Sequence, residues 1–235
     1  PVVLAKDMAT LDVLSEGRME FGIGAGWMQS DYDKAGMEYD RPGIRIERMQ
    51  ESLAIIRGLF SDGPVNFDGE HYQITDMEGW PKPVQSPPPI HIGGGGKRML
   101  GIAAQEADIV GITANLRAGV VGRDATNDVT PEKFDEKVDW IRTAAGDRID
   151  DIELSVLVFS TQVTDDKESA VNGTAEMFGF TTDQIEQTPM LLIGSSEEIA
   201  DSLRERRERW GISYIIVQDT AIDTLTPVVA ELTGT

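Results

Sequence analysis

Segments with the pattern of β-strands alternate along this chain with segments that have the period of helices, and this alternation constrains the fold most. Five main strands are expected, at residues 19–24, 90–94, 107–112, 152–163 and 212–218. Helices are expected at residues 3–15, 44–60, 97–105, 166–180 and 196–210 and after Thr130. The alternation predicts a parallel sheet, either open and doubly wound or closed into a (β/α) barrel.

The length of the chain bears on the choice between these folds. A closed eight-stranded barrel usually takes about 250 residues, and this chain has 235. Five strands are three fewer than such a barrel needs. Residues 62–89 lack helical period, and apolar residues at 65–67 and 72–74 flank Asp68-Gly69, which is typical of a hairpin. We interpret residues 62–89 as an excursion from the main fold.

Two segments of the predicted helices carry patterns that suggest how they pack. Leu4, Met8 and Leu11 repeat at the i, i+4, i+7 spacing of one buried face. The basic residues at 204–209 alternate with glutamates, which is typical of a solvated helix face with i, i+4 ion pairs.

The composition excludes several classes of function. The formal net charge of −20 argues against nucleic acid and anionic membranes as partners. Cysteine is absent, which excludes disulfides, thiolate metal sites and a cysteine nucleophile, and fits a reducing cytoplasm. No apolar run approaches the ~20 residues of a membrane span. We therefore expect a cytoplasmic protein that acts on a small-molecule substrate.

The first expected strand ends in glycines at positions 22, 24 and 26, followed by Trp27. A dinucleotide fingerprint needs glycine at position 27, so that interpretation is excluded. Glycine has no Cβ, so its backbone can lie directly against a flat ligand. We interpret this segment as a shelf for a planar ring with Trp27 as a wall; close packing of helix on strand is the alternative.

A second glycine segment, residues 93–96, follows the second main strand, and a helix begins at Lys97. Backbone N–H groups at a helix start bind phosphate with the help of the helix dipole. A Walker loop is excluded because Arg98 stands where Ser or Thr is required. The segment is interpreted as an anion site.

The two histidines, His71 and His91, lack the spacing of zinc ligands, and we expect no metal. His91 lies between isoleucines and is expected to be buried, whereas His71 lies on the excursion and is a candidate for substrate contact. No residue is identified as catalytic. A phosphorylated flavin-like cofactor therefore accounts for both glycine segments and would carry the chemistry.

Residues 4–18 (LAKDMATLDVLSEGR) and 21–27 (FGIGAGW) resemble the luciferase-like monooxygenase superfamily, and most closely the branch that uses coenzyme F420. Residues 87–96 (PPPIHIGGGG) and 195–213 resemble later parts of the same family. The resemblance implies one (β/α)8 TIM-barrel domain over residues 1–235. The five strands are then its fourth to eighth, and its first three lie upstream of Pro1.

The resemblance also implies the cofactor site. The residues expected to line the deazaflavin ring and ribityl chain are Gly24, Ala25, Gly26 and Trp27, and Ser30 is expected to reach the tail. The residues expected to hold the phosphate are Gly93, Gly94, Gly95, Gly96 and Lys97.

The implied function is an F420-dependent oxidoreductase that moves a hydride between the deazaflavin and an organic substrate. The alternatives are an FMN-dependent two-component monooxygenase and, from another class, a non-catalytic flavin-binding or dimerisation protein. Relatives are usually dimers or larger, so a homo-oligomer is expected.

Overall fold

A computed structural model describes residues 1–120 and 127–234 and shows an α/β fold with a parallel sheet. The strands of this sheet hydrogen-bond in the order β1 (Phe21–Ile23), β4 (Ile90–Gly94), β5 (Ile109–Ile112), β6 (Glu153–Leu157) and β9 (Ile212–Ile216). β1 runs parallel to β4, and β6 runs parallel to β9. The predicted parallel sheet is confirmed, and its closure into a barrel stays a prediction.

Helices alternate with these strands as the sequence predicts. They are α1 (Val2–Leu14), α2 (Gln29–Ala35), α3 (Pro42–Phe60), α4 (Lys97–Glu106), α6 (Pro131–Ala145), α7 (Lys167–Phe178), α8 (Thr182–Gln187), α9 (Ser196–Trp210) and α10 (Ile222–Leu232), with 3-10 turns at Gly146–Asp151 and Asp219–Ala221. Of these, α2, α8 and α10 were not predicted from the sequence. The side chain of Thr130 caps α6, and Ser195 forms a capping box with Glu198 at the start of α9.

The chain divides into two compact units. The first holds residues 1–93, 106–109 and 116–120, and the second holds residues 94–105, 110–115 and the described residues from 127 onward. The single barrel domain stays a prediction.

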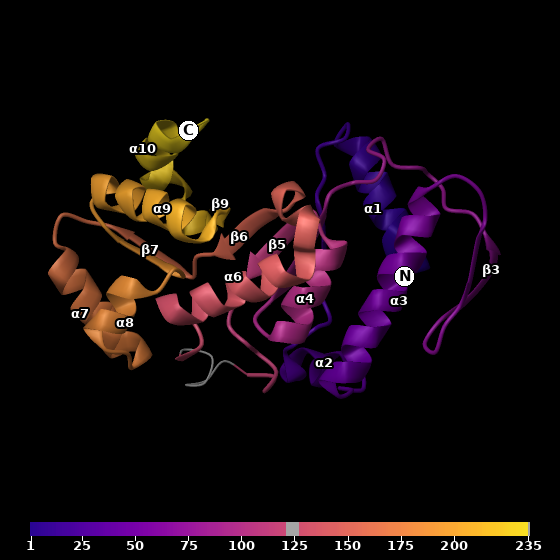
Figure 1. Cartoon of the computed structure of the whole chain (residues 1–235), viewed down its shortest axis with the longest axis horizontal. Coiled ribbons are helices and arrows are strands. Elements are labelled where there is room, and N and C mark those ends of the chain that lie inside the picture. The colour runs from indigo at the N-terminus through magenta and orange to yellow at the C-terminus, as the bar shows by residue number, and fades with distance from the viewer. Residues whose placement is uncertain (121–126, 235) are drawn as a thin grey trace. The chain divides into compact units, whose positions relative to one another are not determined.

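In the first unit, α1 packs beside α3 (Figure 1). The predicted buried face of α1 is wrong, because Leu4 and Leu11 are 38% and 48% exposed. Ala5, Ala9 and Asp12 are buried instead. These three share the same helical spacing, so periodicity alone does not tell which stripe faces a neighbour.

The excursion is fastened to the helices of the first unit. Its hairpin of β2 (Val65–Asp68) and β3 (Gln73–Met77) is antiparallel, as predicted. At the turn, the Glu51 carboxylate of α3 accepts the backbone N–H groups of residues 70–72, at 2.8–3.0 Å. Further along, the Asp12 carboxylate accepts the backbone and side-chain N–H groups of Gln85, at 2.9 and 2.7 Å.

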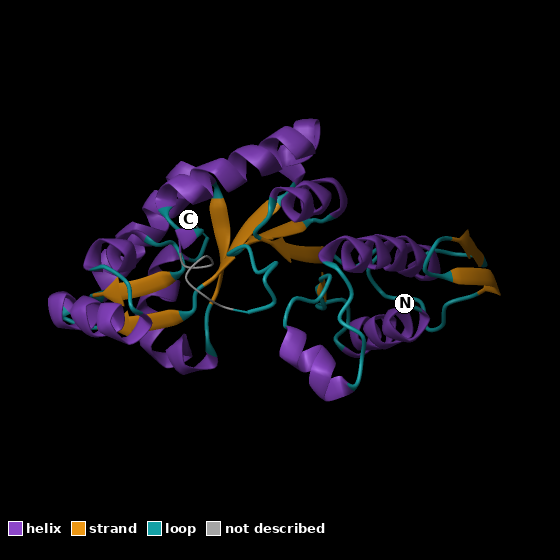
Figure 2. Ribbon diagram, turned by 90° about the horizontal axis from the view of Figure 1, so that it is seen from below, coloured by secondary structure: helices purple, strands orange, loops and turns teal. Residues whose placement is uncertain are grey.

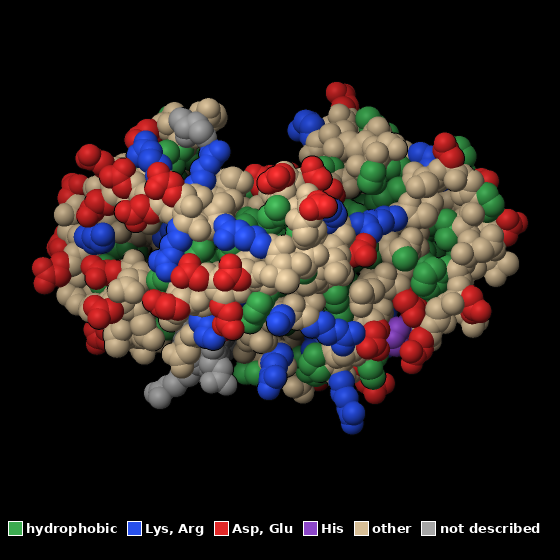
Figure 3. Space-filling model, viewed as in Figure 1, with side chains coloured by type: hydrophobic (Ala, Val, Ile, Leu, Met, Phe, Trp, Pro, Cys, Tyr) green, Lys and Arg blue, Asp and Glu red, His purple; other side chains and the backbone are tan. Residues whose placement is uncertain are grey.

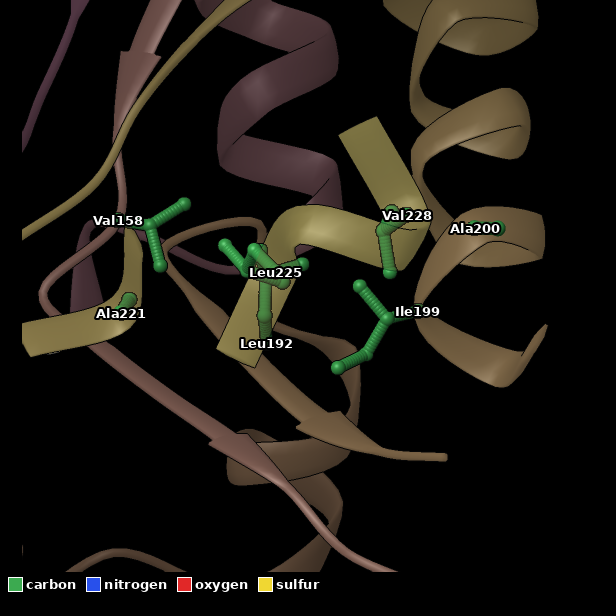
Figure 4. Close-up of a cluster of buried hydrophobic side chains, with 7 residues drawn as sticks. All are labelled: Val158, Leu192, Ile199, Ala200, Ala221, Leu225 and Val228. Carbon is green, nitrogen blue, oxygen red and sulfur yellow. The ribbon is translucent and has the colours of Figure 1, made fainter. Parts of the chain in front are cut away.

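In the second unit, the expected strand 152–163 is two strands, which corrects the prediction. After β6 the chain leaves its pairing with β9 and begins to pair with β8. Val158 N still donates to Ile216 O at the end of β9, whereas Phe159 N donates to Met190 O, just before β8. β7 (Ser160–Val163) then pairs in parallel with β8 (Leu191–Gly194), a strand that the sequence analysis missed (Figure 2). Val158 packs at this change of partner in a buried apolar cluster from β8, α9 and α10 (Figure 4).

The pKa of Glu51 predicts how the contribution of its hydrogen bonds with the hairpin turn to stability depends on pH. Desolvation raises this pKa, but the backbone N–H donors of residues 70–72 outweigh it and hold the value below the ordinary 4.5. The stabilisation is therefore present above pH 4.5 and is lost as the pH falls through the lower, folded-state pKa. Glu51→Gln is expected to lower the urea midpoint at neutral pH, and the gap to wild type is expected to close in acid.

The exposed Glu176→Gln on α7 is the matched control and should leave the midpoint unchanged at every pH. A gap for Glu51→Gln that stays constant into acid would show that the charge of Glu51 does not anchor the hairpin.

Candidate cofactor site

The backbone after β1 faces open space at two of its three glycines. A Cβ at Gly22 or Gly24 would meet no heavy atom within 4 Å, and both residues are exposed. Gly26 is different, because its φ is 70° and a Cβ would lie 2.2 Å from the Tyr32 hydroxyl oxygen. The positive φ at residue 26 therefore favours glycine at this position of the turn after β1. At Gly22 and Gly24 the backbone is bare, and contact of this backbone with a planar ring stays a prediction.

A buried arginine that the sequence analysis missed holds this segment. Arg45 of α3 is 5% exposed, and its guanidinium donates to the carbonyl oxygen of Gly26. It also donates to Asp40 O at 3.0 Å and Tyr39 Oη at 3.2 Å, and Tyr39 Oη donates to Trp27 O at 2.7 Å. Its position, four residues before the buried Met49 on the same helix, was the signal that could have revealed it.

The remaining residues expected near the ring lie in the same unit. The Ala25 carbonyl accepts the Tyr32 hydroxyl at 3.5 Å, and Trp27 is half-buried. Ser30 lies in the first turn of α2 and is exposed. This helix occupies a segment for which the sequence analysis expected no helix.

The second glycine segment follows β4 and leads into α4, which begins at Lys97 as predicted. A Cβ at Gly95 would lie 2.2 Å from the carbonyl carbon and oxygen of Ala114, so only glycine fits this close backbone contact. Gly94 O accepts Thr113 N at 3.0 Å. Lys97 is exposed at the helix start, where cationic side chain and helix dipole both favour an anion.

The histidines behave differently from one another. His71 N donates to the Glu51 carboxylate at 2.9 Å, and its Nε2 is buried without a hydrogen-bond partner among the described residues. Its contact with a substrate stays a prediction. His91 on β4 is half-buried; burial lowers its pKa, and the charge of Glu20 opposes this.

The basic segment of α9 is not wholly a solvated face, which corrects the sequence interpretation. Arg206 is 7% exposed and donates to Pro189 O and Leu191 O, both at 2.7 Å. Its burial lowers its pKa to about 10. Arg209 is exposed as expected, but its ion-pair partner at 2.6 Å is Asp135 of α6 and not a residue one turn away on α9.

Acidic side chains are numerous over the left part of the face shown in Figure 3, with basic side chains among them and along its lower centre, and the sequence has 41 acidic against 21 basic residues. Within residues 1–120 and 127–234, no group of three His, Asp or Glu side chains could hold a metal ion. None of the described helices is long and apolar enough to cross a membrane.

The structure brings Gly24, Ala25, Gly26, Trp27 and Ser30 together in the first unit. It places residues 94–97 together in the second unit, while Gly93 belongs to the first. That both segments bind one cofactor stays a prediction.

Residues 1–214 match the luciferase-like monooxygenase family, and the chain belongs to this family. It is 33% identical over 108 residues to F420-dependent glucose-6-phosphate dehydrogenase of Amycolatopsis mediterranei (strain U-32), covering 46% of this chain and 32% of that protein. It is 28% identical over 232 residues to 5,10-methylenetetrahydromethanopterin reductase of Archaeoglobus fulgidus, covering 95% of this chain and 64% of the reductase.

A third relative, FMNH2-dependent dimethylsulfone monooxygenase of Pseudomonas putida, is 26% identical over 121 residues, which are 51% of this chain and 33% of the enzyme. The solved structure of coenzyme F420-dependent tetrahydromethanopterin reductase from Methanopyrus kandleri shares the fold, with a TM-score of 0.73 and 19% identity. That alignment covers 98% of this chain and 78% of the reductase chain. The match spans about a third of the length of the first curated relatives.

The contrast between Gly24 and Gly26 gives a prediction about stability. Gly26→Ala is expected to lower the free energy of unfolding by about 1–3 kcal/mol, because alanine is strained at positive φ and meets Tyr32. Gly24→Ala is expected to change it by less than about 0.5 kcal/mol, because the site of its Cβ is open. Urea unfolding of both variants checks this, and equal losses would contradict the distinction.

Proposed function

We propose that this chain is an F420-dependent oxidoreductase that transfers a hydride between the deazaflavin and an organic substrate. The open glycine backbone after β1, in a chain whose relatives include F420-dependent enzymes, is the observation that carries the proposal. When bound, F420 supplies hydride chemistry at C5.

The residues of the chain fit the parts of this cofactor. The backbone of residues 24–27 contacts the ring and ribityl chain, and Trp27 forms a wall. Ser30 reaches toward the tail. The backbone N–H groups of residues 93–97 and the positive end of α4 hold the phosphate. The contribution of the protein is to position the reactants and exclude water.

An FMN-dependent two-component monooxygenase is the second candidate. The observation in its favour is the match to the FMNH2-dependent enzyme of P. putida. F420 and FMN share a tricyclic ring, a ribityl chain and a phosphate, so the two glycine segments fit both. The anionic oligoglutamate tail of F420 distinguishes them, and a direct comparison of affinity separates the two candidates.

The test is a fluorescence titration of the purified chain with F420 and, separately, with FMN. Tighter binding of F420 is expected, and Gly24→Ala is expected to weaken it about tenfold because the added methyl separates ring and backbone. Gly173→Ala on α7 is the matched control, since its Cβ also meets open space, and it should leave affinity unchanged.

Tighter binding of FMN than of F420 would contradict the F420-dependent oxidoreductase and favour the FMN-dependent monooxygenase. Binding without hydride exchange to any of a panel of alcohols and aldehydes would favour a non-catalytic flavin-binding protein. Binding of neither cofactor would overturn the proposal. Light scattering of the same sample tests the proposed homo-oligomer.

A further inference from the structure

Lys137 of α6 is a fully buried cation that lies outside the residues proposed to contact the cofactor. Its side chain is 0% exposed, and Nζ donates to Thr113 O at 2.7 Å, Asp128 O at 2.7 Å and Asp128 Oδ2 at 2.6 Å. These contacts match the three donors of an ammonium group. Burying a charge is costly, so an apolar side chain would fill this space with less penalty. The position of the acceptors suggests what the lysine does.

Both acceptor residues hold the segment that follows β5. The carbonyl of Thr113 accepts from Lys137, while Thr113 N donates to Gly94 O at 3.0 Å. The Asp128 carboxylate oxygen that accepts from Lys137 also accepts Asn115 N at 2.7 Å. One ammonium group and one carboxylate therefore hold both ends of residues 113–115.

This segment lies directly against the second glycine segment. A Cβ at Gly95 would lie 2.2 Å from Ala114 carbonyl atoms and 2.4 Å from Asn115 N, so the two backbones touch. A Cβ at Gly96 would lie 3.2 Å from Asn115 Nδ2. Because packed backbones cannot move independently, the position of residues 113–115 sets that of residues 94–96.

We propose that Lys137 is a positioning residue for the cofactor phosphate: through Thr113 and Asp128 it holds residues 113–115 against the glycine segment that binds this group. The inference rests on the proposed function, because it takes residues 93–97 as the phosphate site. Lys137 does not contact the phosphate itself, because its three N–H donors already bind protein acceptors. It acts through residues 113–115.

The test compares ligands with and without the phosphate: FMN and riboflavin differ in the phosphate alone, whereas F420 differs from its deazariboflavin core in the phosphate and the tail. Lys137→Met removes the ammonium group and keeps most of the side-chain volume. Affinities of wild type and variant are measured for F420 and its phosphate-free deazariboflavin core, and for FMN and riboflavin. Lys137→Met is expected to lower affinity for the phosphorylated ligands about tenfold and to leave the phosphate-free ligands unchanged.

Arg206→Met is the matched control, because Arg206 is also a buried cation of the second unit that donates to backbone carbonyls. It is expected to lower stability without changing discrimination between phosphorylated and phosphate-free ligands. If Lys137→Met does not fold, Asp128→Asn is the milder variant: it removes the ion pair and keeps an oxygen acceptor. Hydrogen exchange provides a second readout, with faster exchange expected at residues 94–97 in Lys137→Met and not in Arg206→Met.

The outcomes separate the two proposals. A wild-type protein with equal affinity for phosphorylated and phosphate-free ligands overturns the phosphate site itself. A wild-type preference for phosphate that survives unchanged in Lys137→Met overturns only the role of Lys137. If Lys137→Met and Arg206→Met lose the preference for phosphate equally, the loss comes from general destabilisation. This result also overturns the proposed role of Lys137.

Discussion

Buried cations that donate to backbone carbonyls fix the loops of this protein from within. A carbonyl removed from water needs a donor, and an irregular segment cannot supply one through a sheet or helix ladder. Arg45 supplies donors to the segment after β1, Lys137 to the segments at 113 and 128, and Arg206 to the start of β8. In each case one side chain contacts two or more acceptors, so its displacement would leave several polar groups unsatisfied.

This arrangement has a functional consequence within each unit. The glycine backbone at Gly24 is open to solvent, while Arg45 fixes its neighbour Gly26 from the interior. In the second unit, Lys97 is exposed at the start of α4 while the glycines before it rest on residues 113–115. Both segments can present a surface to a ligand without being loose, which is what a preorganised binding site needs.

The buried cations contribute more to the stability of this protein than the exposed ones do. Basic residues number 21 against 41 acidic residues, and exposed pairs such as Arg209 with Asp135 contribute little to stability. Removing a buried cation costs more, because the carboxylate or carbonyls that it contacts lose their partner. For Lys137 that partner is Asp128, which in turn holds Asn115.

Elements whose signals lie within a few residues could be predicted from the chain: the alternating strands and helices, the hairpin at Asp68-Gly69, and the caps Thr130 and Ser195. Contacts between distant residues could not. The buried stripe of α1, the change of partner after Val158, and the need for Gly95 depend on which surface the folded chain brings near. Helical period and caps depend on local backbone geometry, whereas burial and close backbone approach exist only once remote segments pack.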